Sequence, residues 1–196
     1  MTVKLGLTGS IGMGKSTTAK MFADEGCDVW DADAAVHRLY AKGGAAVAPM
    51  QQAFPDAVQN GAVSRTALKD IIGADPDALQ KIEKIVHPLV AQDRASFVEK
   101  SRSDIIVFDI PLLFETGGEA AMDATVVVSA PPTVQKARVM ERGTMTEAQF
   151  EQIRSKQMPD AEKRTRADFV IITDTVEHAR AQVQSVVRQL RGQGNA

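Results

Sequence analysis

The chain has 196 residues and a mass of 21.1 kDa, a length that suits one domain with room for a small insertion. Its 44% hydrophobic and 24% charged residues disfavour both a disordered chain and a membrane protein. The net charge of −2 and the pI near 5.9 argue against nucleic acid as a partner. A single cysteine, Cys27, excludes an internal disulfide, and the first residues lack the pattern of a secretory signal. We therefore expect a soluble cytoplasmic protein.

Short apolar segments rich in β-branched residues alternate with longer helical patterns, which predicts a parallel sheet with crossover helices. The expected strands are 3–8, 27–32, 105–110, 124–129 and 169–172. Because these segments are apolar almost throughout, we expect both of their faces to be buried. The predicted fold class is therefore α/β, a five-stranded parallel sheet flanked by helices.

The first expected strand leads into GSIGMGKS, residues 9–16, which fits G-x-x-x-x-G-K-[ST] at every fixed position. Glycines let the backbone N–H groups approach phosphate oxygens, and the helix that follows directs its positive end to the same place. We expect the lysine to reach the β- and γ-phosphates of ATP and the serine hydroxyl to bind Mg²⁺. The residues assigned to this ATP site are Gly9, Gly12, Met13, Gly14, Lys15, Ser16 and Thr17.

Two aspartates, Asp31 and Asp33, follow the second expected strand. Ligands of α/β sheets bind at the carboxyl ends of the strands, so we expect both carboxylates near the phosphate loop. There they could orient a substrate hydroxyl, accept its proton or hold Mg²⁺ through water. The alternative is that Asp33 only caps a helix that begins at Ala34. Asp109, at the end of the third expected strand, is a second candidate for supporting Mg²⁺.

About 70 residues with helical patterns separate the second and third expected strands. Gly43-Gly44 predicts the end of one helix, Asp75-Pro76 the start of another with proline in its first turn, and His87-Pro88 a helix break. We expect a helical subdomain, residues 41–101, inserted at the carboxyl edge of the sheet. His37 is expected on a helix surface, whereas His87 stays open between a structural and a functional role.

Residues 136–166 hold eight of the 23 basic residues of the chain. This segment is either a solvated helical face or a lid whose arginines neutralise a transferring phosphoryl group and exclude water. Arg142 and Arg154 are the first candidates for that role, followed by Arg138. Thr146 with Gln149 predicts a capping box that starts a helix inside the segment.

A phosphate loop alone does not identify an activity. A GTP-dependent switch is disfavoured, because neither N-K-x-D nor D-x-x-G follows the later strands. A small-molecule kinase accounts for the loop, the insertion and the basic segment together. Another nucleoside or nucleotide kinase, and an ATP-dependent switch or binding protein, remain as alternatives.

Several motifs in order make the chain resemble the dephospho-CoA kinase family over nearly its whole length. They are LTGSIGMGKST (7–17), DADAAVH (31–37), HPLV (87–90), DIPLLFE (109–115), RVMERG (138–143), IRSKQM (153–158) and ADFVI (167–171). The resemblance implies an adenylate-kinase-like P-loop fold. It also implies that ATP phosphorylates the ribose 3′-hydroxyl of 3′-dephospho-CoA to give CoA, and we expect a monomer or a small homo-oligomer.

By the same resemblance, Asp33 is the general base, residues 12–17 bind ATP, and Arg142 lies in a lid that spans residues 136–166. Catalysis is thus assigned to Asp33, Lys15 and Arg142, and binding of the CoA moiety to residues 41–101. The substrate-binding residues are expected to be Asp31, Asp33, Arg65, His87 and Arg154. The chain departs from the family pattern at Gly73, Gly143 and Ile172-Thr173.

Overall fold

The computed structural model of the chain describes residues 2–193, which divide into two compact units. One unit contains residues 2–30 and 101–193 and carries the main sheet. The other contains residues 31–100 and is mainly helical. No helix within residues 2–193 combines the length and the apolar character that crossing a lipid bilayer requires.

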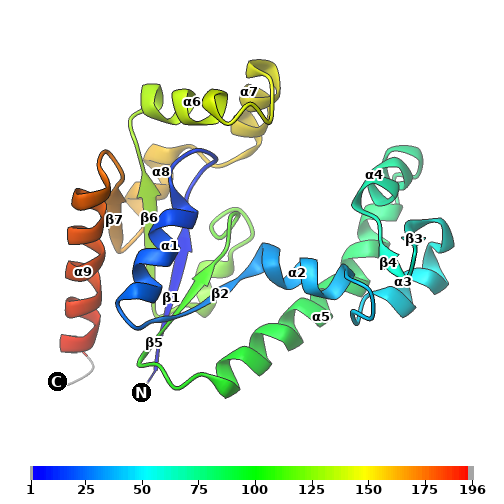
Figure 1. Ribbon diagram of the computed structural model, residues 1–196, viewed down its shortest axis with the longest axis horizontal. Helices are drawn as coiled ribbons and strands as arrows, with labels where there is room; N and C mark the ends of the chain where they lie inside the picture. The colour runs from blue at the N-terminus through cyan, green and yellow to red at the C-terminus, as the bar shows by residue number, and fades with distance from the viewer. Residues whose placement is uncertain (1, 194–196) are drawn as a thin grey trace. The chain divides into compact units, whose positions relative to one another are not determined.

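The main sheet has five strands in the order β2-β5-β1-β6-β7, which confirms the predicted five-stranded sheet (Figure 1). The strands are β1 (Val3–Thr8), β2 (Asp28–Asp31), β5 (Ile105–Asp109), β6 (Ala124–Ser129) and β7 (Phe169–Ile172). β1 runs parallel to both of its neighbours, so that Leu5 lies opposite Val107 on β5 and Ala124 on β6. The carboxyl ends of β1, β5, β6 and β7 therefore meet at one edge of the sheet.

Helices α1 (Lys15–Asp24) and α9 (Val176–Gln193) lie side by side on one face of this sheet (Figure 1). Their apolar residues, among them Phe22 and Val183, join the strand residues in one buried core. The segment after β5, which includes the short helix η2 (Gly118–Ala121), packs against the sheet at Gly6, where a Cβ atom would lie 2.7 Å from the Leu113 side chain. Every residue of β5 and β6 is buried, as predicted. The prediction of full burial is wrong for the edge strands β2 and β7, most of whose residues are partly exposed.

Three helices fill the segment between β6 and β7: α6 (Pro132–Glu141), α7 (Glu147–Lys156) and α8 (Asp160–Arg166). Figure 1 shows α6 and α7 beyond the carboxyl edge of the sheet. The predicted capping box is confirmed, because Thr146 Oγ1 accepts from the N–H of Gln149 while Gln149 Oε1 accepts from the N–H of Thr146. The segment thus contains a helix whose start is encoded locally in the sequence.

The helical unit has its own core, centred on Met50, Leu68, Ile82 and Val86. Its elements are α2 (Ala32–Tyr40), α3 (Val47–Ala53), η1 (Pro55–Ala57), β3 (Val58–Gln59), β4 (Ala62–Val63), α4 (Arg65–Ala74) and α5 (Ala78–Lys100). β3 and β4 form an antiparallel hairpin, and α2 ends just before the glycine pair at 43–44, as predicted. The helix predicted to start at Pro76 begins two residues later, at Ala78. The side chain of Asp75 accepts from the N–H of Asp77 just before this start, as a residue that caps a helix does.

The predicted helix break at His87-Pro88 is also wrong, since α5 runs through Pro88. A proline inside a helix removes one backbone hydrogen bond and crowds the carbonyl one turn earlier, here that of Lys84. His87, Pro88 and Lys84 are all exposed, so water can serve that carbonyl. The opposite side of the helix, with Ile82 and Val86, is buried in the core, and this packing holds the helix together across the proline.

Candidate active site

The phosphate loop, residues 9–16, connects the carboxyl end of β1 to α1 and packs tightly at two glycines. Gly12 and Gly14 have φ angles of 77° and 90°, a region that side chains other than glycine rarely occupy. A Cβ atom at Gly12 would lie 2.6 Å from Val139 of α6, and one at Gly14 would lie 3.2 Å from Thr173 Oγ1. Glycine is therefore required at both positions by backbone conformation and by space.

The N-terminus of α1 lies directly after this loop and carries no side-chain cap. Gly14 is the N-cap residue, no side chain in the described part of the chain caps the helix, and its first turn contains no acidic residue. The first N–H groups of the helix and the positive end of its dipole are thus available to an anion. This arrangement is a phosphate-binding site in physical terms.

Lys15, the first residue of α1, forms an ion pair with Asp109 at the end of β5. The side chains of Lys15 and Asp109 are only 18% and 3% exposed. Ser16 follows with an exposed hydroxyl group. Residues 2–193 contain no cluster of three or more His, Cys, Asp or Glu side chains that could enclose a metal ion. One carboxylate and one hydroxyl suit Mg²⁺, which is usually held by one or two protein ligands together with phosphates and water.

A pocket of about 340 Å³ lies beside α1. Two of the predicted arginines, Arg138 and Arg142, line it. Arg138 is fixed by Thr173, because its Nη1 donates to Thr173 Oγ1 over 2.9 Å and its Nη2 donates to the Thr173 carbonyl. Thr173 lines the pocket too, and the remaining lining residues are Gly14, Thr17, Thr18, Met21, Glu141, Thr175, Val176 and Ala179. The phosphate loop, the end of α6 and the chain after β7 thus meet around one hollow.

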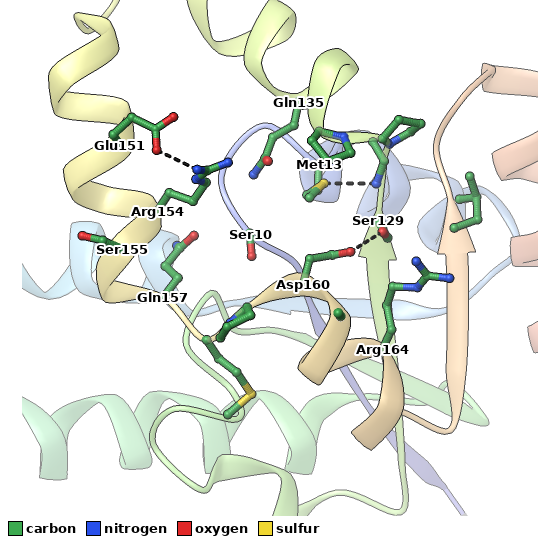
Figure 2. A pocket seen from close by; sticks show the side chains of 17 residues that line it. Ser10, Met13, Ser129, Gln135, Glu151, Arg154, Ser155, Gln157, Asp160 and Arg164 are labelled. Atoms are coloured by element: carbon green, nitrogen blue, oxygen red, sulfur yellow. Dashed lines mark hydrogen bonds and ion pairs between the residues drawn. The ribbon is translucent and has the colours of Figure 1, made fainter.

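A second, larger pocket of about 690 Å³ lies on another side of the phosphate loop (Figure 2). Ser10 and Met13 of the loop line it together with Arg154 of α7 and residues of α8. Arg154 is half-exposed and pairs with Glu151 at 2.8 Å. Arg154 therefore shares a pocket with Ser10 and Met13 of the loop, whereas Arg138 and Arg142 share one with Gly14.

Two glutamines that the sequence patterns do not single out also contact the loop. Gln135 of α6, which is buried, donates from Nε2 to the carbonyl of Ile11 over 2.8 Å. Gln157, just after α7, accepts from the N–H of Ile11 over 3.2 Å. Gln157 lies within the IRSKQM motif, which was the available signal for it. The contact of Gln135 is visible only in the three-dimensional structure.

The end of the basic segment is fixed by a buried ion pair. Lys163 of α8 is fully buried and lies 2.8 Å from Glu115, which follows β5. Glu115 also accepts from the N–H of Met158 over 2.9 Å. Burial raises the pKa of the Glu115 carboxyl, but the contacts with Lys163 and with Met158 outweigh it and hold that pKa below its usual range.

Asp31, the last residue of β2, and Asp33 belong to the helical unit and have different local roles. Asp31 is the N-cap of α2, and its Oδ1 accepts from the N–H of Ala34 over 2.9 Å. Asp33 lies in the first turn of the helix and is exposed. The alternative in which Asp33 caps a helix beginning at Ala34 is therefore wrong: α2 begins at Ala32, and Asp31 is the cap.

The other candidates for the acceptor side also lie in the helical unit. Arg65, the first residue of α4, holds its guanidinium 5.6 Å from the centre of the Tyr40 ring. His87 and His37 are exposed, on α5 and α2 respectively.

Known proteins supply the comparison for this arrangement. A family model described as dephospho-CoA kinase matches residues 3–178. The dephospho-CoA kinase of Ruegeria pomeroyi is 74% identical over 191 residues, which cover 97% of each chain. The crystal structure of TT1252 from Thermus thermophilus superposes with a TM-score of 0.85 at 31% identity, covering 96% of this chain and 97% of that one. Dephospho-CoA kinase from Campylobacter jejuni superposes over 100% of both chains with a TM-score of 0.71 at 22% identity, a likeness that shows the fold.

Proposed function

The chain belongs to the dephospho-CoA kinase family, an assignment that makes it an ATP-dependent kinase, and we propose the reaction that it catalyses. In this proposal it transfers the γ-phosphoryl group of ATP to the ribose 3′-hydroxyl of 3′-dephospho-CoA, which yields CoA and ADP. One observation supports the binding of ATP, the phosphoryl donor, more than any other. The N-terminus of α1 has no side-chain cap, and Lys15 is the first residue of this helix. The family resemblance seen in the sequence is confirmed.

We assign ATP binding to the phosphate loop and the 340 Å³ pocket beside it. The N–H groups of Gly14, Lys15, Ser16 and Thr17 hold phosphate oxygens, and the Lys15 ammonium neutralises charge on the β- and γ-phosphates. Arg138 and Arg142 line the adjacent pocket, which is of a size to take the nucleoside part. This assignment is supported by the shared position of both arginines next to Gly14.

We propose that Ser16 and Asp109 hold Mg²⁺ together with the ATP phosphates. The buried carboxylate of Asp109 and the Ser16 hydroxyl are hard oxygen donors, as Mg²⁺ prefers. When bound, the ion supplies charge neutralisation at the phosphates. Lys15, which pairs with Asp109, orients that carboxylate.

We propose that residues 41–101 hold the CoA moiety and that Asp33 is the general base, with Asp31, Arg65 and His87 on the same acceptor side. The proton leaves the 3′-hydroxyl for the Asp33 carboxylate as the oxygen attacks the γ-phosphorus. The exposure of Asp33, together with the use of Asp31 rather than Asp33 as the helix cap, supports this role. Arg65, held against Tyr40, offers a cation to the diphosphate of the acceptor.

We propose that residues 136–166 act as the lid, with Arg142 stabilising the charge on the transferred group and Arg154 contacting the substrates. Both side chains are at least partly exposed, so they can move to phosphates without losing a buried partner. A closed lid would exclude water, which otherwise competes with the 3′-hydroxyl for the phosphoryl group.

We further propose that the enzyme works in the cytoplasm, as a monomer or a small homo-oligomer, with no nucleic acid or membrane partner. The single buried cysteine and the modest net charge of −2 support this setting.

An acceptor panel tests the proposed function. Purified protein with ATP and Mg²⁺ is offered dephospho-CoA, nucleosides, nucleotides or shikimate, and ADP release is followed. We expect ADP release in the presence of dephospho-CoA and with none of the other acceptors. Robust turnover of a different acceptor would instead identify another P-loop kinase, and slow ADP release that no acceptor accelerates would identify an ATP-dependent switch or binding protein.

A further inference from the structure

Thr173, the residue directly after β7, joins three parts of the nucleotide site. It is buried, with 7% of its surface exposed, and its N–H donates to the carbonyl of Ser129 at the end of β6 over 2.9 Å. This bond fixes the backbone of residue 173 against the carboxyl edge of the sheet. From that fixed point the hydroxyl group reaches the phosphate loop on one side and Arg138 on the other.

The hydroxyl group of Thr173 has its single proton committed to the loop. Oγ1 lies 2.6 Å from the carbonyl oxygen of Met13 and 3.4 Å from that of Ser129, so the proton goes to Met13. Because the peptide unit is planar and trans, the N–H of Gly14 points away from the Met13 carbonyl. Anchoring that carbonyl to Thr173 therefore turns the Gly14 N–H to the other side of the peptide, which is the direction in which a phosphate loop offers its N–H groups.

The lone pairs of the same oxygen orient Arg138. Nη1 of Arg138 donates to Thr173 Oγ1 over 2.9 Å, and Nη2 donates to the carbonyl of Thr173. Two hydrogen bonds from one guanidinium to one residue fix the plane of the guanidinium as well as its position. Arg138 then forms a wall of the 340 Å³ pocket in a defined orientation.

We propose that Thr173 is a positioning residue for ATP: one hydroxyl group sets both the Met13-Gly14 peptide of the phosphate loop and the guanidinium plane of Arg138. This inference rests on the proposed function for the identity of the nucleotide. To the proposed function it adds Thr173, a residue that touches no reacting atom. Thr173 affects the binding of ATP and not that of the acceptor.

The test compares three variants of Thr173 with one matched control. Thr173→Val replaces the hydroxyl by a methyl group next to the Met13 carbonyl, Thr173→Ala removes the hydroxyl without adding bulk, and Thr173→Ser keeps it. The control is Thr125→Val, because Thr125 is also buried, donates to Asp168 over 2.8 Å and lies near the amino end of β6. The measurements are the Kd for ATP by calorimetry, the KM values for both substrates, and Tm.

We expect Thr173→Val and Thr173→Ala to raise the Kd and KM for ATP about tenfold, because the Met13-Gly14 peptide and the Arg138 guanidinium each lose one hydrogen bond that orients them toward ATP. The KM for dephospho-CoA stays within about twofold in the same variants, as expected when only donor-side contacts change. Thr173→Ser, which keeps the hydroxyl group, should bind ATP with the Kd of the wild type. Thr125→Val should lower Tm and leave the Kd for ATP unchanged.

The inference is overturned if Thr173→Ala binds ATP as the wild type does, if Thr173→Ser fails to restore binding, or if Thr125→Val weakens ATP binding equally. If Thr173→Val does not fold, Thr173→Ala decides the question. Calorimetry with ATP alone needs no acceptor, so a failure of the proposed acceptor assignment is seen separately, as wild-type protein that binds ATP without phosphorylating dephospho-CoA.

Discussion

Lys15 and Asp109 form an ion pair that joins the first residue of α1 to the last residue of β5. The two strands that lead to these residues, β1 and β5, are neighbours in the sheet. The pair therefore connects the group assigned to the phosphates with the group assigned to Mg²⁺. Since both side chains are largely buried, salt screens their attraction less than it would that of a surface pair.

We predict that Asp109→Asn raises the Mg²⁺ concentration needed for half-maximal rate by roughly tenfold or more, the usual effect of losing a residue that binds or orients a metal. The measurement is a Mg²⁺ titration of the kinase rate at saturating ATP. Asp123→Asn is the control, because the Asp123 side chain accepts from the N–H of Lys4 near the amino end of the sheet. An unchanged Mg²⁺ requirement in Asp109→Asn would remove Asp109 from the metal site.

The separate roles of Asp31 and Asp33 give a sharper test of the general base. Asp33→Asn should lower kcat by roughly 10²-fold or more and leave ATP binding and the free energy of unfolding unchanged, because Asp33 is not the helix cap. Asp31→Ala should destabilise the protein by about 1 kcal/mol, as loss of an N-cap does. Steady-state kinetics and urea unfolding measure the two effects, and normal turnover in Asp33→Asn would contradict the assignment.

The buried pair of Glu115 and Lys163 predicts a dependence of stability on pH. The pKa of Glu115 in the folded protein is below its ordinary value of 4.5, so its contribution is fully present above that pH and is lost as the pH falls through the folded pKa. Glu115→Gln should destabilise the protein by about 3 kcal/mol at neutral pH, because Lys163 is left as a buried charge. Below about pH 4.5 the difference from wild type should shrink.

Urea unfolding across the pH range measures this difference. The control is Glu147→Gln, which breaks the exposed pair with Lys136 and should cost less than about 1 kcal/mol at every pH. Equal effects of the two substitutions would show that the contact between Glu115 and Lys163 does not stabilise the attachment of the lid segment.

The only thiol of the chain should be inert in the folded protein. Burial raises the pKa of the Cys27 thiol to about 11, and Cys27 is buried in the core of the sheet unit. At about pH 8 an ordinary thiol, with a pKa of about 8.5, is partly ionised and reacts with iodoacetamide. Cys27 should therefore react slowly at this pH until denaturant is added. Fast modification of the native protein, read by mass spectrometry, would contradict the buried position.

The features that the sequence predicts well are those encoded locally. The five strands, the phosphate loop after β1 and the capping box of Thr146 and Gln149 each depend on residues within one short segment. The hairpin of β3 and β4 has the local signal Asn60-Gly61, with positive φ at both residues. Its strands are only two residues long, which is too short for an alternating pattern to reveal them.

Other features depend on packing between distant segments, and the sequence pattern misses them. Pro88 predicts a helix break, but the apolar face of α5 is held by the core of the helical unit. The Thr173 hydroxyl contacts Met13 across 160 positions of the chain, and Gln135 contacts Ile11 across 124. No periodicity or motif spacing reports on such contacts, so the hydrogen bonds of Thr173 and Gln135 to the phosphate loop became visible only in the structure.

The central claim is transfer of the γ-phosphoryl group to the 3′-hydroxyl of dephospho-CoA, and the most direct measurement identifies the product. ATP labelled at the γ-phosphate is incubated with the protein, Mg²⁺ and dephospho-CoA, and the product is analysed by mass spectrometry and phosphorus NMR. We predict one labelled phosphomonoester on the ribose 3′-oxygen, formed in equal amount to ADP. Label released as inorganic phosphate, or carried at another position, would contradict the claim.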